Sequence, residues 1–319
     1  MLLSLFEHDL SENGYPLFRI MLSKEEPLPP IRSRSINHPG PVAPERFAVA
    51  KGTIERRRVT LRSGCSANEA IGEAMAEAAF SGGYLRLKGV GLEPMAYVIP
   101  AASPDEAHAA WYSGAFAPPG VSMIEDAGFN IGSRDGKSFF HCHGIWTEPD
   151  GGRRMGHLLP DLASFQRPVE AEMIGIRGAR FDATEDAETN FKLFMPERHG
   201  AESETGEAAL LAQVRPNADI CHSIEEICRL HGIRSAVIHG IGSLVGLELT
   251  DGTIVDSYAT EVLITRGELS DRQGKPECRL DIALVDMNGA IWEGTVKRGV
   301  NPVCVTFEVL IEDRTSAQA

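Results

Sequence analysis

Two tandem domains that each combine helix and strands are the fold that the sequence predicts, because the chain contains a diverged internal repeat. Lys88-Gly89-Val90-Gly91 is echoed by His239-Gly240-Ile241-Gly242, and each motif follows an apolar segment that itself follows a helix-like segment. Pro168-Val169 and Pro302-Val303 each open an alternating final strand. The same order of elements occurring twice indicates two copies of one structural unit.

Each predicted domain begins with a strand, a turn and a helix. In the first domain these are a strand over residues 59–62 and a helix from Ala67 to Phe80, whose apolar residues recur at helical spacing. In the second they are a strand over residues 212–215 and a helix near His222 to Leu230, with Ser223 as its predicted cap.

The repeat and the composition between its copies divide the chain into four predicted segments. Residues 1–44 are an N-terminal extension, and residues 45–176 are the first domain. Residues 177–207 are rich in Glu, Asp, Thr and Gly and are predicted to be a linker. Residues 208–314 are the second domain.

Three histidines in the first domain are the strongest functional signal. Residues 139–146 are apolar and aromatic enough for a buried strand, on which His141 and His143 share one face. Residues 148–152 predict a hairpin turn, which would place His157 opposite His143 with Cβ atoms about 5 Å apart. Three imidazoles would then converge in the manner of a three-histidine metal site with an open position.

The predicted cofactor is a divalent metal, with zinc as the default for imidazole ligands and nickel, iron or copper as alternatives. A hydrogen-bonded histidine cluster without metal is the other interpretation of the same pattern. A structural metal in an assembly module would require a closed site in which the protein supplies every ligand, whereas an open position favours chemistry.

Several other residues are candidates for supporting roles. His38 in the N-terminal extension is a candidate further ligand, or else only shapes a turn. Glu148 and Asp161 are the carboxylates nearest in sequence and are candidates for a catalytic base or a partner of the histidines, or else are turn and capping residues. Trp111 and Tyr112 lie in an insertion interpreted as a lid over the site or as a surface loop packed by its own aromatic side chains.

The second copy repeats the ribbon without its histidines. Arg279 and Asp281 stand where His141 and His143 stand, and Thr295 takes the place of His157, with the same 14-residue interval between hairpin partners. Arg279 would repel a cation, so the second copy is predicted to bind no metal there.

The charge balance argues against nucleic acid as a partner. The net charge is −14, and phosphate contacts need clustered Lys and Arg. Residues 24–58 carry eight Lys or Arg against four Glu, which leaves a local basic patch as one interpretation and a charged edge strand as the other.

The expected location is the cytoplasm, with no membrane segment. No apolar run approaches the roughly 20 residues of a membrane helix, and the first residues do not resemble a signal peptide. The six cysteines form no CxxC pair, so free thiols of a reducing compartment are the simplest account.

With helix, Gly-x-Gly strand, HxH ribbon and Gly-His in this order, the chain resembles the plant and prokaryote conserved (PPC) domain in tandem. The resemblance covers about residues 45–176 and 208–312, and the second copy matches by order and spacing only. The residues that carry it are His141, His143, Gly156, His157 and Leu158.

The resemblance implies a compact α+β domain with a mainly antiparallel sheet, in which the three histidines are proposed metal ligands. It also implies a homo-oligomer, because single-domain prokaryotic members form trimers, and a trimer of chains is the simplest closed arrangement. Plant members join the domain to an AT-hook that grips DNA. No Arg-Gly-Arg-Pro core occurs here, so this mode of DNA binding does not carry over.

The function expected from these observations is a metal-binding protein of the PPC family that binds or hydrolyses a small molecule at an open three-histidine site. One alternative is a DNA-associated regulatory protein, supported by the family association and the basic patch. Another is a cupin-like metalloenzyme, since His141, His143, Glu148 and Gly156 approach the first cupin motif. Glu148 falls on the wrong strand face for that motif unless a bulge intervenes, and the second cupin motif is missing.

Overall fold

Hydrogen-bonded strands run from one half of the chain into the other in the computed structural model, which describes residues 34–203 and 205–315. Residues 1–33 of the predicted N-terminal extension lie outside the described residues. The strands of the first half are β1 (Phe47–Leu61), β2 (Gly82–Leu87), β3 (Val90–Leu92), β4 (Tyr97–Val98), β5 (Pro100–Ala101), β6 (Trp111–Tyr112), β7 (Ser122–Arg134), β8 (Lys137–Thr147), β9 (Arg153–Leu158), β10 (Val169–Glu185) and β11 (Lys192–His199). Those of the second half are β12 (Glu207–Val214), β13 (Ser235–Leu244), β14 (Leu247–Glu248), β15 (Ile254–Val255), β16 (Thr260–Arg272), β17 (Lys275–Asp286), β18 (Ile291–Thr295) and β19 (Val303–Asp313).

The two halves have the same strand order. It is β9-β8-β7-β2-β10-β1 in the first half and β18-β17-β16-β13-β19-β12 in the second, and β1 pairs with β12 to join them. All registered strand pairs of the described residues are antiparallel except a short parallel pairing between β10 and β7. The predicted fold class, α+β with a mainly antiparallel sheet, is confirmed.

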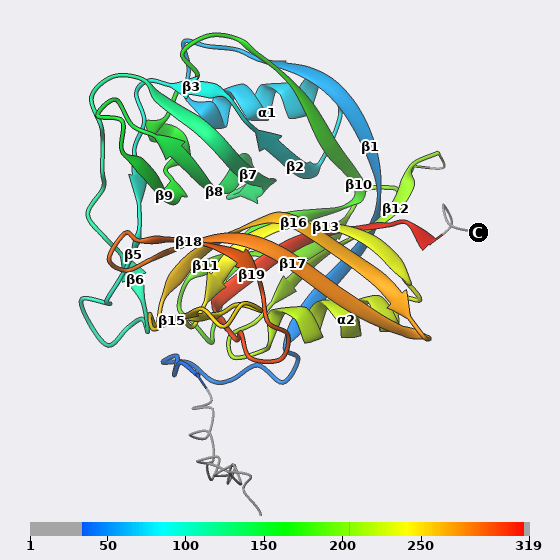
Figure 1. Cartoon of the computed structure of the whole chain (residues 1–319). Coiled ribbons are helices and arrows are strands. Elements are labelled where there is room, and N and C mark those ends of the chain that lie inside the picture. Colours follow the sequence, from blue (N-terminus) through cyan, green and yellow to red (C-terminus); the bar gives the residue numbers. More distant parts are fainter. Residues whose placement is uncertain (1–33, 204, 316–319) are drawn as a thin grey trace, which may run out of the picture. The chain divides into compact units, whose positions relative to one another are not determined.

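The two halves of this continuous sheet pack face to face, and they are called the two sheets below. A helix lies on the outer face of each (Figure 1). The helices are α1 (Ala67–Glu77) and α2 (Ile220–Leu230), and a short 3-10 turn spans Pro160–Leu162. Between the sheets, Ile145 and Met155 of the first half pack with Ile241, Leu263 and Val285 of the second half. This inner core holds β8 and β9 against the second half.

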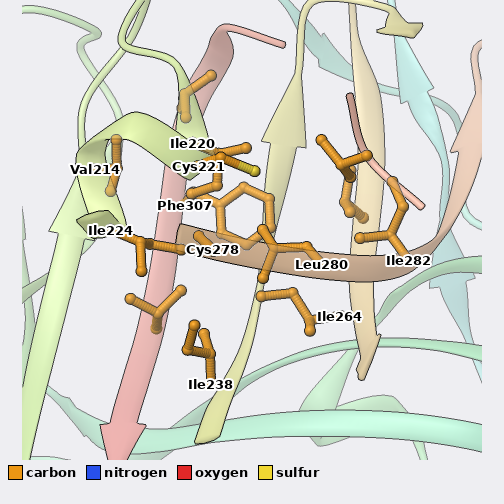
Figure 2. Packing of buried hydrophobic residues seen from close by; sticks show 14 of the residues in the cluster. Val214, Ile220, Cys221, Ile224, Ile238, Ile264, Cys278, Leu280, Ile282 and Phe307 are labelled. Atoms are coloured by element: carbon orange, nitrogen blue, oxygen red, sulfur yellow. The ribbon is translucent and has the colours of Figure 1, made fainter. Parts of the chain in front are cut away.

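The outer core of the second half lies under α2. Figure 2 shows the ring of Phe307 in the middle of this cluster, with Cys221 and Ile224 of α2 and Leu280 of β17 around it. Phe307 and Val309 face α2, so the residue between them, Glu308, faces the other way, toward the first half.

Each helix differs from the prediction at one end, while the start of α1 at Ala67 and the end of α2 at Leu230 are as predicted. The first ends at Glu77 rather than Phe80, and Ala79 then takes a left-handed conformation with φ of 55°. The second begins at Ile220, and its N-cap is Asp219, whose carboxylate accepts a hydrogen bond from the His222 amide at 2.9 Å. Ser223, the predicted cap, lies inside the helix, because Asp219 satisfies the first free amide groups before it.

Ser66 caps α1 through a capping box. Its hydroxyl accepts from the Glu69 amide at 3.1 Å, and the Glu69 carboxylate accepts from the Ser66 amide at 2.9 Å. We expect Ser66→Ala to lower the free energy of unfolding by about 1 kcal/mol, measured by urea denaturation. Ser270→Ala, at an exposed strand position, is the control and should change it by less than about 0.5 kcal/mol. Equal effects of the two substitutions would contradict this account of the cap.

The segment predicted as a linker is structured. Strand β10 runs from Val169 to Glu185, so it continues across the predicted boundary at residue 176. Strand β11 follows and pairs with β10 over eight residues. One side of β11 carries the buried Phe194, and that apolar burial outweighs the polar composition on which the linker prediction depended.

The basic residues at 56–58 lie in β1 and are largely neutralised. Arg56 donates to the Glu312 carboxylate at 2.6 Å, and Arg57 lies 3.2 Å from that of Glu55. In the part of the chain that the structure describes, no helix is long and apolar enough to cross a membrane.

Candidate metal centre

The three histidines of the β8–β9 hairpin converge. His143 and His157 are directly paired across the hairpin, and His141 precedes His143 on the same face. One nitrogen from each ring lies within 4.8 Å of the other two. The turn that brings them together closes through the Glu148 amide, which donates to the Gly152 carbonyl at 2.9 Å.

Residues of the second half orient two of the three rings. The Nδ1–H of His141 donates to the Glu308 carboxylate at 2.6 Å, and the Nδ1–H of His143 donates to the Val262 carbonyl at 2.9 Å. These bonds fix the tautomer in which each Nε2 carries a lone pair, as metal-ligating histidines require.

The Nε2 atoms of His141 and His143 face each other at 3.0 Å. The Glu261 carboxylate is also close, with Oε2 2.6 Å from the Nε2 of His143. Three atoms that accept hydrogen bonds therefore meet at one point in a buried place. Such an arrangement is unfavourable unless a proton or a metal cation lies among them.

The electrostatics of the rings differ. Burial lowers the pKa of His141, but the charge and hydrogen bond of Glu308, together with the charge of Glu261, outweigh it and raise the pKa above its ordinary value. Burial, with repulsion from the other two rings, holds the pKa of His157 well below its ordinary value, so this ring stays neutral. Its Nδ1 is buried without a hydrogen-bond partner among the described residues.

Glu261 and Glu308 were not among the predicted site residues. Glu261 directly precedes the buried apolar run 262–264 of β16, and Glu308 stands between the buried Phe307 and Val309 of β19; each is itself buried, with 6% and 1% of its surface exposed. That pattern is the signal that points to them, because a charged residue in a buried strand requires a specific partner.

Of the predicted further ligand and carboxylates, Asp161 lies beside the cavity of the histidines, and Glu148 and His38 lie elsewhere. Glu148 accepts from the Tyr97 hydroxyl at 2.6 Å and does not line the cavity beside the histidines, so the cupin-like arrangement is not formed. Asp161 lies at the edge of that cavity and accepts from Asn68 at 3.0 Å. His38 donates through Nε2 to the Cys304 carbonyl at 2.8 Å and does not belong to the histidine group.

The corresponding place in the second half is filled by its own polar contacts. Asp281 and Thr295 are paired across β17 and β18, as His143 and His157 are across β8 and β9. Arg279 donates to Asp281 at 3.2 Å and to Thr295 at 3.0 Å. The Arg279 guanidinium thus takes the place of a cation beside Asp281.

The histidines open onto a cavity of about 750 Å³. This volume is within the range of small-molecule sites, which is about 300–1,000 Å³. Trp111 and Tyr112 of the predicted lid line it, together with Phe194 of β11. The ring of Tyr112 lies 5.2 Å from that of His157, so β6 reaches the histidines.

The structure defines a class of protein, in which two antiparallel α+β halves enclose a hairpin with three histidines. The family model of the Plants and Prokaryotes Conserved (PCC) domain, named PPC above, matches residues 201–314, which include the whole predicted second domain. The match falls on the half without the histidines, although their signature carried the resemblance in the sequence.

Solved structures that are similar to part of the chain come from several microorganisms. A metal-containing protein from Archaeoglobus fulgidus is 18% identical, with a TM-score of 0.35, over 44% of this chain and 93% of its own. A PPC protein from Pyrococcus horikoshii is 20% identical, with a TM-score of 0.28, over 33% of this chain and 77% of its own. A candidate DNA-binding protein from Bacteroides thetaiotaomicron is 19% identical, with a TM-score of 0.30, over 34% of this chain and 78% of its own. No curated protein matches the chain.

Proposed function

We propose that the chain binds a divalent metal ion, zinc by default, through His141, His143 and His157, and uses it to bind or hydrolyse a small molecule in the adjoining cavity. The observation that carries this proposal is the pair of Nε2 atoms facing each other at 3.0 Å, each left as an acceptor by the bond that its Nδ1–H makes.

The donor set fits such an ion. Ligand nitrogens about 2.0–2.1 Å from a tetrahedral zinc ion lie about 3.3 Å from one another, close to the separation here. Glu308 and the Val262 carbonyl hold two rings in place from behind, an arrangement typical of metal-binding histidines. The neutral ring of His157, with its unpartnered Nδ1, supplies the third imidazole of the set.

The chemistry also depends on groups beside the histidines. A divalent ion there would act as a Lewis acid. Glu261 is placed to complete the ligand set or to accept a proton from a molecule in the cavity. Burial, with the charges of Glu261 and Glu308, raises the pKa of Tyr112 well above its ordinary value, so its hydroxyl keeps its proton and can donate a hydrogen bond.

A zinc titration of the protein and of its Glu308→Gln variant tests the proposal. We expect one ion per wild-type chain, and an affinity about 10- to 100-fold lower in the variant, because the carboxylate that orients His141 is lost. Glu172→Gln, with a side chain 71% exposed, is the control and should bind as the wild type does. No saturable zinc binding by the wild type would contradict the proposal.

We also propose that residues 45–176, together with the rest of β10, are a second, diverged PPC domain, so that this domain and residues 208–314 form a tandem pair. The identical strand order of the two halves supports this division. In such a pair the first domain provides the histidines, and the second provides the carboxylates and the carbonyl that surround them.

Assembly and location remain predictions. We expect a homo-oligomer with a trimer favoured, although the facing sheets already bury apolar surface within the chain. A single species near 34.6 kDa in light scattering at micromolar concentration would reject the oligomer. A cytoplasmic location is supported by six cysteines that are all free thiols.

A further inference from the structure

Aromatic side chains from three separate segments line the cavity beside the histidines. Trp111 and Tyr112 come from β6, Phe139 from β8, and Phe191 and Phe194 from the start of β11 and the turn before it. Most other large aromatic side chains of the described residues, such as Phe129 and Phe140, are instead buried in the cores. A metal site alone does not require a cavity lined by five aromatic side chains, so these side chains point to a ligand.

One series of ring contacts starts at His157. The Tyr112 ring lies 5.2 Å from it, and the Trp111 ring lies 6.3 Å from that of Tyr112. Trp111 then stacks on Phe191, with 5.4 Å between the ring centres and 26° between the planes. Trp111 remains 38% exposed, so much of its ring surface is free for a further contact.

A second series starts at His141. The ring of Phe194 lies 6.4 Å from it, and that of Phe139 lies 6.1 Å from Phe194. The guanidinium of Arg134 lies 5.2 Å from the centre of the Phe139 ring, at the end of the series. Among the described residues no carboxylate lies within ion-pair distance of Arg134. Lys192, also on the cavity wall, is paired with Asp135.

These observations together indicate a planar ligand. Aromatic rings contact one another most favourably at centre separations of about 4.5–7 Å, which the residues of both series already show among themselves. Phe139 and His141 are two residues apart on β8, so their Cα atoms lie about 7 Å from each other along the strand. This separation is about the length of a six-membered ring that carries an acidic group.

We propose that the cavity binds an aromatic acid, whose ring contacts Trp111 and Phe194 and whose acidic group points toward His141, His143 and His157. This proposal rests on the metal site proposed above, because the ion would receive the acidic group. The aromatic walls are what select a ring over an aliphatic group of similar size.

Calorimetric binding of three hydroxamates to the zinc-loaded protein tests this. Acetohydroxamate offers the metal-binding group alone, benzohydroxamate adds an aromatic ring, and cyclohexanecarbohydroxamate adds an aliphatic ring of similar size. We expect benzohydroxamate to bind at least about tenfold more tightly than acetohydroxamate, and about three- to tenfold more tightly than the cyclohexyl compound.

Trp111→Ala should remove most of the preference for benzohydroxamate while leaving acetohydroxamate binding and zinc content unchanged. Phe116→Ala is the control, since Phe116 is 43% exposed and does not line the cavity. Phe194→Leu, which keeps an apolar side chain in the wall, is a second variant with the same expected direction.

The outcomes separate the two proposals. Equal affinity for benzohydroxamate and the cyclohexyl compound, or a preference that survives both Trp111→Ala and Phe194→Leu, overturns the aromatic ligand while the metal site stands. Failure of all three compounds to bind, with zinc at background level, overturns the metal site and this inference with it.

Discussion

Replacing His143 with alanine is expected to abolish metal retention, measured as zinc per chain by elemental analysis after dialysis. The Nε2 of His143 lies 3.0 Å from that of His141 and 2.6 Å from the Glu261 carboxylate, so it lies at the centre of the candidate site. Without it two imidazoles remain, and the loss of one of three nitrogen ligands leaves an incomplete zinc site.

His143 is fully buried, so folding must be measured beside metal content. Circular dichroism and thermal unfolding would show whether the variant folds, and His157→Gln, at a less buried position, gives a second test of the same site. His222→Ala is the control, because that side chain is 58% exposed and lies in α2. A folded His143→Ala protein with an undiminished zinc content would refute the assignment.

Glu312→Ala is expected to lower the free energy of unfolding by about 3 kcal/mol, because it removes the buried carboxylate that accepts hydrogen bonds from two partly exposed guanidinium groups and from His239. Glu312 is fully buried in β19 and accepts from Arg56 at 2.6 Å, from Arg314 at 2.6 Å and from His239 at 2.8 Å. Arg56 belongs to β1, so this carboxylate also ties the first half to the second. Urea denaturation at neutral pH measures the effect, and Glu170→Gln, at an exposed position of β10, should have little effect.

The same carboxylate should make stability fall in acid. Burial alone would raise the pKa of Glu312, but its hydrogen bonds and charge interactions with His239 and Arg56 lower it to about 2. The unfolded chain binds this proton more readily, so the contribution is present above about pH 4.5 and is lost as the pH falls toward 2. The contribution is about 3 kcal/mol. Glu312→Gln should lack this part of the pH dependence, and parallel profiles of wild type and variant would contradict it.

Much of the candidate site could be predicted from the sequence because it depends on local geometry. Strand alternation places His141 and His143 on one face whatever the strand packs against. The polar turn fixes the hairpin register, so His157 meets His143 without any long-range information. The repeat of helix and strand order likewise predicts the α+β class, because each unit is read from residues adjacent in the chain.

Local sequence patterns did not predict where α2 begins or that residues 192–199 form a strand. Asp219 takes the cap position expected of Ser223, a choice between neighbouring residues that depends on where α2 docks. Strand β11 lies within residues 177–207, whose overall composition is typical of a linker. It becomes a strand because β10 offers it a hydrogen-bonding edge and because Phe194 is buried.

The sequence by itself determined the three converging imidazoles, and only the tertiary structure decided what surrounds them. Glu308 is 167 positions from His141, and Val262 is 119 positions from His143. Their meeting depends on the packing of one sheet against the other, which no periodicity within a strand specifies. The physical reason is that a strand's own pattern fixes which face a side chain points to, whereas its partner across that face is selected by burial and charge over the whole fold.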